Sequence, residues 1–563
     1  MSIRDFMQVI IFITVLVLLA PPLGQYMANV FGGRRTFLYP VLSRLERMTY
    51  RLCGISTSEE MTWRSYTKAL LWFNAFGFGI LFVLQVTQKV LPLNSAGLGN
   101  VRWASAFNTA VSFMTNTNWQ SYAGETTLSY LAQTLGLTVQ NFVSAATGIA
   151  VMLALIRGIA RKTAISIGNF WVDLTRAVVY VLLPLSIVLA VVLVGQGVVQ
   201  TFSPSINATT IEGTIQTIPL GPAASQIAIK QLGTNGGGFF NANSAHPFEN
   251  PTPLSDFLEM LAILIIPAGL VFTYGRMANA RRHAVVIFSV MLALFIGGLA
   301  LSLHSEFSPN PTLGIESNME GKETRFGVVN SVLWSISTTA ASNGSVNAMH
   351  SSLSPLSGGM AMLNIMLGEI VFGGVGAGMY GMILFILLAV FLSGLMVGRT
   401  PEYLGKKIEA REVQMAILAI LLTNAVILIG SGMASVLPVA LAGLANKGPH
   451  GFSEILYAFS SAAGNNGSAF AGLNANTDFY NLMLGVSMLI GRFGVIVPCL
   501  AIAGSMVSKK ISSPSTGSFA TDNSTFAVIL IAVILIVGAL TFLPALCLGP
   551  IVENLLMHGG AAF

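Results

Sequence analysis

The sequence predicts an all-α polytopic membrane protein with ten transmembrane helices, arranged as four span–pore-loop–span repeats around a central pore. Three observations lead to this prediction. The chain of 563 residues is 54% hydrophobic and only 9% charged, whereas a soluble globular protein carries about 25% charged residues. Ten apolar segments have a length near that needed to cross a bilayer. A short polar motif recurs four times between these segments.

The ten spans follow from length and composition, because a bilayer core about 30 Å thick needs about 20 apolar helical residues. The first span is too uniformly apolar for a cleavable signal peptide, and Arg34 and Arg35 follow it. We therefore expect an anchored span with its N-terminus outside. The predicted spans are 7–31, 69–87, 133–156, 177–199, 257–275, 284–303, 360–398, 413–433, 482–507 and 525–548.

Basic residues orient these spans. Most of the 28 lysine and arginine residues lie in the loops at 32–65, 157–176, 276–283 and 399–412 and after the ninth span. With ten spans these loops all fall on one side, which the positive-inside rule assigns to the cytoplasm. Both termini and all four motifs then lie on the outer side. The net charge of +6 resides largely in these loops, so membrane lipid, and no nucleic acid, is expected around the chain.

Each motif follows a semi-apolar stretch that is too short to cross the bilayer but long enough to enter about halfway. A half-helix of this kind points its partly negative C-terminal end at the motif, which favours a cation there. A surface amphipathic helix is the alternative, but recurrence at the same place in four repeats favours pore helices. The stretches are Arg102–Met114, Pro222–Gly233, Phe326–Ala341 and Gly451–Gly464. The motifs are Thr115-Asn116-Thr117-Asn118, Thr234-Asn235-Gly236-Gly237, Ser342-Asn343-Gly344-Ser345 and Asn465-Asn466-Gly467-Ser468.

The composition of the motifs suits a monovalent cation. Gly236, Gly344 and Gly467 hold equivalent positions, and glycine reaches positive φ at little cost, so successive carbonyls can turn toward an axis. Rings of backbone carbonyls replace the hydration shell of such an ion. Calcium or magnesium would favour carboxylates, which the motifs lack, so potassium or sodium is expected. Thr117 stands where the other copies have glycine.

The motif asparagines are expected to brace the loop backbone behind the filter through side-chain hydrogen bonds. The alternative is ordinary turn chemistry, which asparagine also favours. The residues concerned are Asn116, Asn235, Asn343 and Asn466.

The seventh span is too long for one crossing, and its centre holds Glu369 together with Gly374, Gly376 and Gly378. Unwound backbone is tolerated in a membrane only where it is buried or lines a cavity. We interpret this centre as a gate beneath the filter, with close helix packing through small residues as the alternative. Arg492, inside the ninth span, is expected to set the electrostatics of the inner mouth, to pair with Glu369, or to form a structural ion pair.

The sequence shows no nucleotide-binding glycine loop, no Asp-Lys-Thr-Gly phosphorylation motif and no soluble segment large enough for a nucleotide domain. The six histidines lack the spacing of a metal site. We therefore expect neither a catalytic site nor an organic cofactor in this chain, which could not hydrolyse ATP alone.

Long strings around the four motifs resemble the KdpA family, the potassium-binding subunits of the bacterial Kdp potassium-transporting P-type ATPases. The resemblance covers essentially the whole chain, and Thr117 looks like the family's own usage. The matching strings are Thr115–Tyr122, Gly233–Asn243, Ser342–Asn347 and Gly464–Phe470.

The resemblance implies an inner-membrane complex with the P-type ATPase subunit KdpB, which would bind and hydrolyse ATP, and with KdpC and the small KdpF. This chain would select K⁺, the transported ion, with high affinity and pass it to KdpB through an intersubunit tunnel. The broken seventh span, with Arg399 at its end, would block direct passage to the cytoplasm. The implied filter residues are Gln120, Gly236, Ser342–Gly344 and Asn465–Gly467.

A stand-alone potassium transporter of the Trk, Ktr and HKT type is the alternative, because it shares the four-repeat plan. The extra first and last spans and the matching strings favour the ATPase subunit, and a sodium-coupled symporter would show inverted repeats. The expected division is an N-terminal span and loop (1–65), repeat 1 (66–157), repeat 2 (158–276), repeat 3 with the broken span (277–412), repeat 4 (413–510) and a C-terminal span (511–563).

Overall fold

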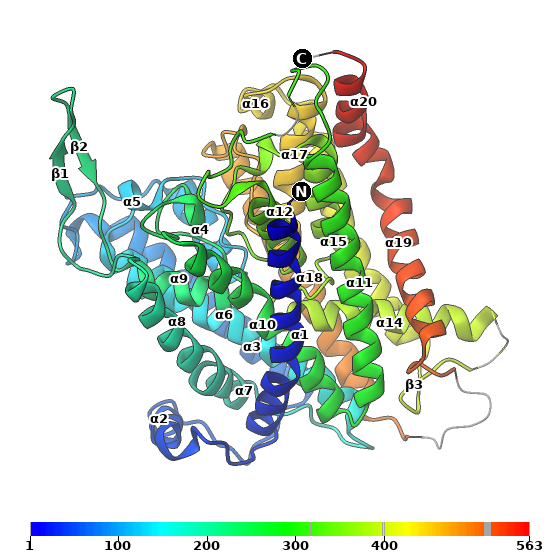
Figure 1. Cartoon of the computed structure of the whole chain (residues 1–563). Coiled ribbons are helices and arrows are strands. Elements are labelled where there is room, and N and C mark those ends of the chain that lie inside the picture. Colours follow the sequence, from blue (N-terminus) through cyan, green and yellow to red (C-terminus); the bar gives the residue numbers. More distant parts are fainter. Residues whose placement is uncertain (1, 316–317, 397, 399, 512–518, 562–563) are drawn as a thin grey trace.

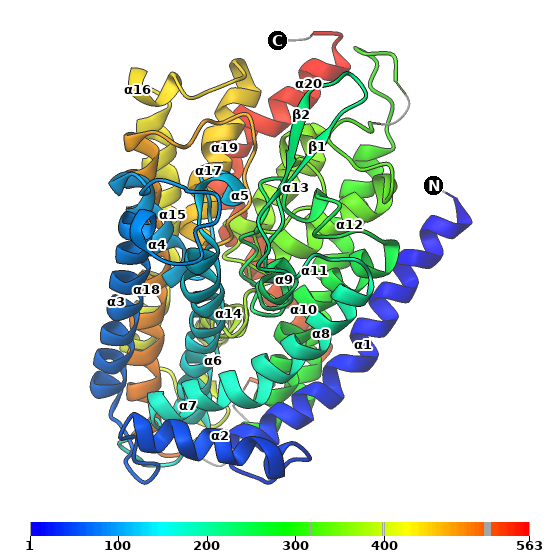
Figure 2. The ribbon, with the colours of Figure 1, turned by 90° about the vertical axis from the view of Figure 1, so that its left-hand side faces the viewer.

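The computed structural model describes residues 2–315, 318–396, 398, 400–511 and 519–561. These residues form a bundle of long helices with two distinct ends (Figures 1 and 2). Within them, ten helical segments are long and apolar enough to cross a membrane, which confirms the ten-span prediction. The segments are Ile3–Phe31, Trp63–Val90, Ala132–Ala160, Phe170–Gly195, Pro253–Met277, Arg281–Glu306, Ala377–Met396, Ala410–Ala434, Asp478–Val507 and Ser524–His558.

Four groups of elements share one order: a long helix, a half-length helix and a second long helix. The chain begins with α1 (Ile3–Phe31) and α2 (Tyr39–Leu52). The first group is α3 (Trp63–Thr87), η1 (Gln88–Val90), α4 (Trp103–Met114), α5 (Gly124–Thr127), η2 (Ala132–Thr138) and α6 (Val139–Ala160). The second is α7 (Phe170–Arg176), η3 (Ala177–Leu182), α8 (Leu183–Gly195), β1 (Ile206–Thr209), β2 (Ile215–Ile218), α9 (Ala223–Leu232), η4 (Asn243–Ala245) and α10 (Pro253–Met277).

The remaining groups repeat this order, and the third adds a further half-length helix and a hairpin. The third is α11 (Arg281–Glu306), α12 (Gly327–Ala340), η5 (His350–Ser352), α13 (Pro355–Met366), α14 (Ala377–Met396), β3 (Glu402–Tyr403) and β4 (Lys406–Lys407). The fourth is α15 (Ala410–Ala434), α16 (Pro438–Leu441), α17 (Gly448–Gly464) and α18 (Asp478–Val507). The last elements are α19 (Ser524–Leu546), η6 (Cys547–Ile551) and α20 (Val552–His558). Strands β1 and β2, and β3 and β4, pair as antiparallel hairpins.

The half-length helices α4, α9, α12 and α17 occupy the stretches expected for pore helices. In both views they lie toward the end of the bundle opposite α2 (Figures 1 and 2). They are buried along nearly their whole length, because the long helices surround them.

The long seventh span is broken, as its glycine content indicates. Helix α13 ends at Met366 and α14 begins at Ala377, and residues 367–376 between them are not helical. Glu369 and Phe372 have φ values of +50° and +68°. A right-handed helix cannot continue through left-handed residues, so the span consists of a half-length helix, an unwound segment and the crossing helix α14.

The hairpin of β3 and β4 closes the end of the bundle opposite the half-length helices (Figure 1). Its Lys406 is fully buried, and its ammonium donates to the carbonyls of Gly158 at 2.8 Å and Met506 at 2.6 Å, as well as to Arg161. These carbonyls terminate α6 and α18. Helix C-termini carry unsatisfied carbonyls and partial negative charge. The ammonium of Lys406 therefore supplies hydrogen-bond donors to the ends of both helices and holds its own strand, β4, in place.

Replacing this cation tests its contribution to stability. We expect Lys406→Met to lower the free energy of unfolding by on the order of 3 kcal/mol, because several buried carbonyls lose a charged donor. The thermal midpoint in detergent micelles measures the effect. The neighbouring Lys407 is exposed, so Lys407→Met is the matched control and should leave the midpoint unchanged. Equal midpoints for the two variants would contradict the capping role.

Candidate functional site

The four motif loops meet at the C-terminal ends of α4, α9, α12 and α17. A Cβ atom built on Gly236 would overlap the backbone of Gly344, and one built on Gly344 would lie 2.8 Å from the carbonyl carbon of Gly467. A Cβ atom on Gly467 would overlap the carbonyl oxygen of Thr117. The loops therefore form a ring in which the second contacts the third, the third the fourth and the fourth the first. Glycine is required at three places by this close approach.

Left-handed residues occur at alternate positions in the first, second and fourth loops, whereas in the third loop Ser342 is left-handed and Gly344 is not. Their φ values are +68° at Asn116, +57° at Asn118, +48° at Thr234, +89° at Gly236, +53° at Ser342, +60° at Asn465 and +102° at Gly467. Alternation of right- and left-handed residues lets successive carbonyls turn the same way. Non-glycine residues adopt the left-handed region at a cost of roughly 1–2 kcal/mol each, and such strain concentrates at functional sites.

The first loop is offset by one residue from the alignment that the sequence suggested. The amide of Thr117 donates to the carbonyl of Ser112 at 2.9 Å, as the amide of Asn235 does to Lys230 at 2.8 Å. Thr117 therefore corresponds to Asn235, and Asn118, with its positive φ, corresponds to Gly236. The prediction that Thr117 stands at the glycine position was wrong. Asparagine also tolerates left-handed backbone, so Asn118 can replace glycine there.

Asn116 ties the first loop to the second. Its Nδ2 donates to the carbonyls of Thr234 at 3.0 Å and Gly233 at 3.3 Å, and its Oδ1 accepts from the hydroxyl of Ser144 at 2.8 Å. The side-chain amide of Asn235 lies 2.7 Å from the same Oδ1. Because all these groups are buried, each bond replaces one that water would otherwise supply.

Asparagines also connect the other loops around the ring. The Nδ2 of Asn343 donates to the carbonyl of Lys230 at 3.2 Å, and the Nδ2 of Asn466 donates to the carbonyl of Thr338 at 3.2 Å. Each of these carbonyls belongs to the half-length helix of the preceding repeat. The same atoms that would brace a turn thus link neighbouring repeats.

The ring is closed between the fourth loop and the first. The Nδ2 of Asn465 donates to Oγ1 of Thr117 at 2.9 Å, and that oxygen lies 2.8 Å from Oγ1 of Thr115. At the edge of the ring, Oε1 of the half-buried Gln120 accepts from the amide of Gly238 at 2.9 Å. The loops therefore share a continuous hydrogen-bonded frame.

The unwound segment after α13 lies against this ring. The amide of Gly373 donates to the carbonyl of Ala340 at 2.9 Å, and the amide of Val375 donates to Oγ1 of Thr234 at 2.9 Å. A Cβ atom on Gly374 would lie 3.1 Å from Cβ of Ser342. The segment therefore contacts the second and third loops where their half-length helices end.

Two more glycines, one at the end of the unwound segment and one in the first turn of α14, make close contacts of their own. A Cβ atom on Gly376 would overlap the backbone of Gly148 in α6, and one on Gly378 would overlap the carbonyl of Phe372. These glycines allow the segment to fold tightly against α6 and onto itself.

Charged residues surround the ring without entering it. Glu369 is only 3% exposed. Its Cδ would lie 3.7 Å from a Cβ atom built on Gly464, the residue just before the fourth motif. Arg492, 5% exposed, donates from Nη2 to the carbonyl of Ser144 at 3.0 Å. The structure describes both residues, and they form no ion pair with each other. Arg399 lies outside the described residues.

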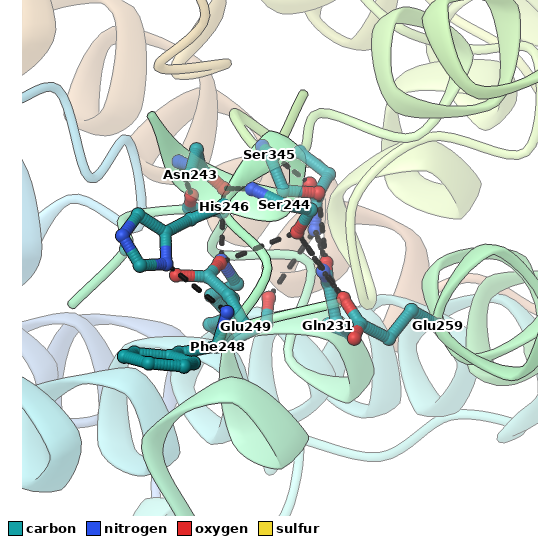
Figure 3. Close-up of polar contacts among 12 residues, drawn as sticks. Gln231, Asn243, Ser244, His246, Phe248, Glu249, Glu259 and Ser345 are labelled. Carbon is teal, nitrogen blue, oxygen red and sulfur yellow. Dashed lines mark hydrogen bonds and ion pairs between the residues drawn. The ribbon is translucent and has the colours of Figure 1, made fainter. Parts of the chain in front are cut away.

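Sequence reasoning overlooked a buried cluster behind the second loop, in which Glu249 and Glu259 (Figure 3) lie together with the buried Lys230. A signal was present, since Lys230 falls inside a stretch expected to enter the membrane, where an ionisable residue indicates a functional position.

The whole chain is similar in fold and in sequence to known proteins. The chain is similar to the crystal structure of the potassium transporter TrkH from Vibrio parahaemolyticus, with a TM-score of 0.52, 15% identity, and coverage of 88% of this chain and 98% of that chain. At this identity the likeness is one of fold.

Curated relatives are much more similar. The potassium-transporting ATPase potassium-binding subunit of Mesorhizobium japonicum is 57% identical, with 100% of each chain covered. The subunit of the same name from Pseudomonas entomophila is 56% identical over 98% of this chain and 99% of its own. The family model for the KdpA potassium-transporting ATPase A subunit matches residues 10–555. The chain therefore belongs to the KdpA family of potassium-transporting ATPase A subunits.

Proposed function

We propose that this chain binds and selects K⁺ from outside the cell and passes it to a P-type ATPase subunit for ATP-driven, high-affinity import. The observation that carries the proposal is the closed ring of four uncharged loops at the C-terminal ends of four half-length helices. Family membership supports the same function. The likeness to TrkH concerns the fold alone and does not favour a stand-alone transporter.

The ring's chemistry supports selection of a monovalent cation. Backbone carbonyls replace the hydration shell of the ion, and the partly negative helix ends stabilise it without a formal charge. Neutral ligands hold a monovalent ion weakly enough for it to leave again. We assign the ion-binding ring to Thr115–Asn118, Gln120, Thr234–Gly237, Ser342–Gly344 and Asn465–Gly467.

Below the ring, the unwound segment with Glu369, Gly374 and Gly376, together with Gly378 in the first turn of α14, would act as the barrier to the cytoplasm. Its contacts with the second and third loops support this role. The buried carboxyl of Glu369 would face an ion that has passed the ring. The ion would wait there until the partner's cycle draws it away.

The family resemblance supports partners of the kinds named KdpB, KdpC and KdpF, with ATP bound by KdpB alone. The distribution of basic loops supports an inner-membrane orientation with both termini and the ring on the periplasmic side. The order of elements supports the division into repeats at 66–157, 158–276, 277–412 and 413–510.

The first test is potassium-stimulated ATP hydrolysis of the complex that co-purifies with this chain, with and without Gly236→Asp. A side chain at Gly236 would overlap the backbone of Gly344 and add a carboxylate to the ring. We expect the potassium concentration for half-maximal stimulation to rise at least tenfold, which corresponds to about 1.4 kcal/mol of binding free energy. An ATPase-free preparation without potassium stimulation would support the stand-alone transporter instead.

A milder variant tests the close approach of the loops. A methyl group on Gly344 would lie 2.8 Å from the carbonyl carbon of Gly467 and 2.9 Å from the carbonyl oxygen of Asn466. We expect Gly344→Ala to weaken apparent potassium affinity about threefold to tenfold, since the loops must move by a few tenths of an ångström. Gly297 in α11 has open space around it, so Gly297→Ala is the control. Equal affinities in both variants would argue against a tight ring.

Arg492→Gln tests the charge beneath the ring. The shorter amide cannot hold the carbonyl of Ser144 in the same way and carries no charge. We expect the uptake rate of Rb⁺, used as a tracer, to fall more than the yield or thermal midpoint of the complex. Loss of assembled protein with an unchanged rate per complex would identify Arg492 as purely structural.

A further inference from the structure

A buried cluster of charged and polar side chains lies behind the second motif loop, where residues of α9, η4 and α10 meet (Figure 3). Lys230, Glu249 and Glu259 are all fully buried. The ammonium of Lys230 is in direct contact with the carboxylate of Glu249. An unpaired charge at this depth would be strongly unfavourable, so Glu249 is the counter-ion that allows a lysine to stand beside a cation site.

One arm of the cluster reaches the ring directly. The Nζ of Lys230 donates to Oδ1 of Asn243 at 2.8 Å, and Nδ2 of Asn243 donates to the carbonyl of Gly236 at 2.9 Å. Asn243 itself has a φ of +54°. The path from Glu249 through Lys230 and Asn243 therefore ends on a carbonyl of the ring.

A second arm reaches the third loop. The Nε2 of Gln231 donates to Glu259 at 2.8 Å, and its Oε1 accepts from the hydroxyl of Ser345 at 2.8 Å. The hydroxyl of Ser244 donates to Glu259 at 3.1 Å and to Glu249 at 3.3 Å, which joins the two arms. The cluster thus holds two adjacent loops from behind (Figure 3).

The other three loops have a hydroxyl residue at the position of Lys230. The carbonyls of Ser112, Lys230, Thr338 and Ser461 each accept from the amide five residues later. Ser112 donates to the carbonyl of Trp119 at 3.0 Å, Thr338 to that of Ser345 at 2.7 Å, and Ser461 accepts from the amide of Gly467 at 2.9 Å. The second loop alone of these four is held by an ion pair and a relay asparagine.

We propose that Lys230, with Glu249 as counter-ion and Asn243 as relay, is a specificity-determining positioning residue for the ion-binding ring. This inference rests on the proposed function and deepens it. The ion pair fixes the relay amide, and the relay fixes the orientation of the Gly236 carbonyl. The ring consequently holds one ion size more rigidly at the second loop than hydroxyl contacts alone would allow.

Two variants interrupt the path at different places. Lys230→Met keeps the length of the side chain and removes its charge and donor. Asn243→Gly removes the relay amide and leaves the ion pair, and glycine retains the left-handed backbone without strain. We expect each variant to reduce discrimination between K⁺ and Rb⁺ or Na⁺ about tenfold, the effect of losing one ordered hydrogen bond. Discrimination is measured as the ratio of half-maximal concentrations for stimulation of ATP hydrolysis by the purified complex.

The chain provides a matched control in a second buried pair. Lys322 and Glu306 lie 3.1 Å apart with both side chains fully buried, and Lys322 donates to the carbonyl of Ser352 at 3.4 Å rather than to a motif loop. We expect Lys322→Met to lower the thermal midpoint and to leave ion discrimination unchanged.

Unaltered discrimination in Lys230→Met and Asn243→Gly, with a loss of thermal midpoint like that of Lys322→Met, would overturn the proposal and leave a purely structural pair. If the complex with Lys230→Met does not assemble, the ion discrimination of Asn243→Gly alone tests the proposal. Measurements on the unmodified complex distinguish this result from a failure of the proposed function. An unmodified complex without potassium stimulation or ion discrimination would contradict the function itself.

Discussion

The structure depends on satisfying the backbone groups of helices that end inside a membrane. Water is absent there, so each exposed carbonyl or amide must find a protein partner. Helices α4, α9, α12 and α17 all end at buried loops, and the loops supply those partners to one another. Asn116, Asn343 and Asn466 each donate to a carbonyl of an adjacent repeat, so no loop can keep its conformation without its neighbours. Carbonyls that the frame does not use remain available to an ion.

The same constraint keeps formal charge out of the ring. The motif loops contain no formal charge, whereas the buried charges stand behind or below them, at Lys230, Glu249, Glu369 and Arg492. A carboxylate in the ring would bind a monovalent ion too firmly and would invite divalent ions. Neutral ligands with charges set behind them combine a defined geometry with reversible binding, as the proposed transport site requires.

The sequence predicted the spans and half-length helices well, because length and hydropathy largely determine what a membrane accepts. The stretch 102–114, for example, became α4 (Trp103–Met114). The predicted register of the first loop was wrong, because Asn118 adopts the left-handed conformation that Gly236 and Gly467 adopt in their loops. Partners distant in sequence, such as Arg492 and Ser144, could not be predicted, since composition fixes the depth of a charge and not the carbonyl that it meets.

Thr234 joins the ring to the segment beneath it. Its backbone is left-handed, its carbonyl accepts from Asn116, and its hydroxyl oxygen accepts from the amide of Val375. Displacing the unwound segment would break the last of these bonds and leave a buried amide without a partner, which carries a substantial desolvation cost. The position of the unwound segment and the geometry of the ring are therefore energetically coupled through the side chain of Thr234.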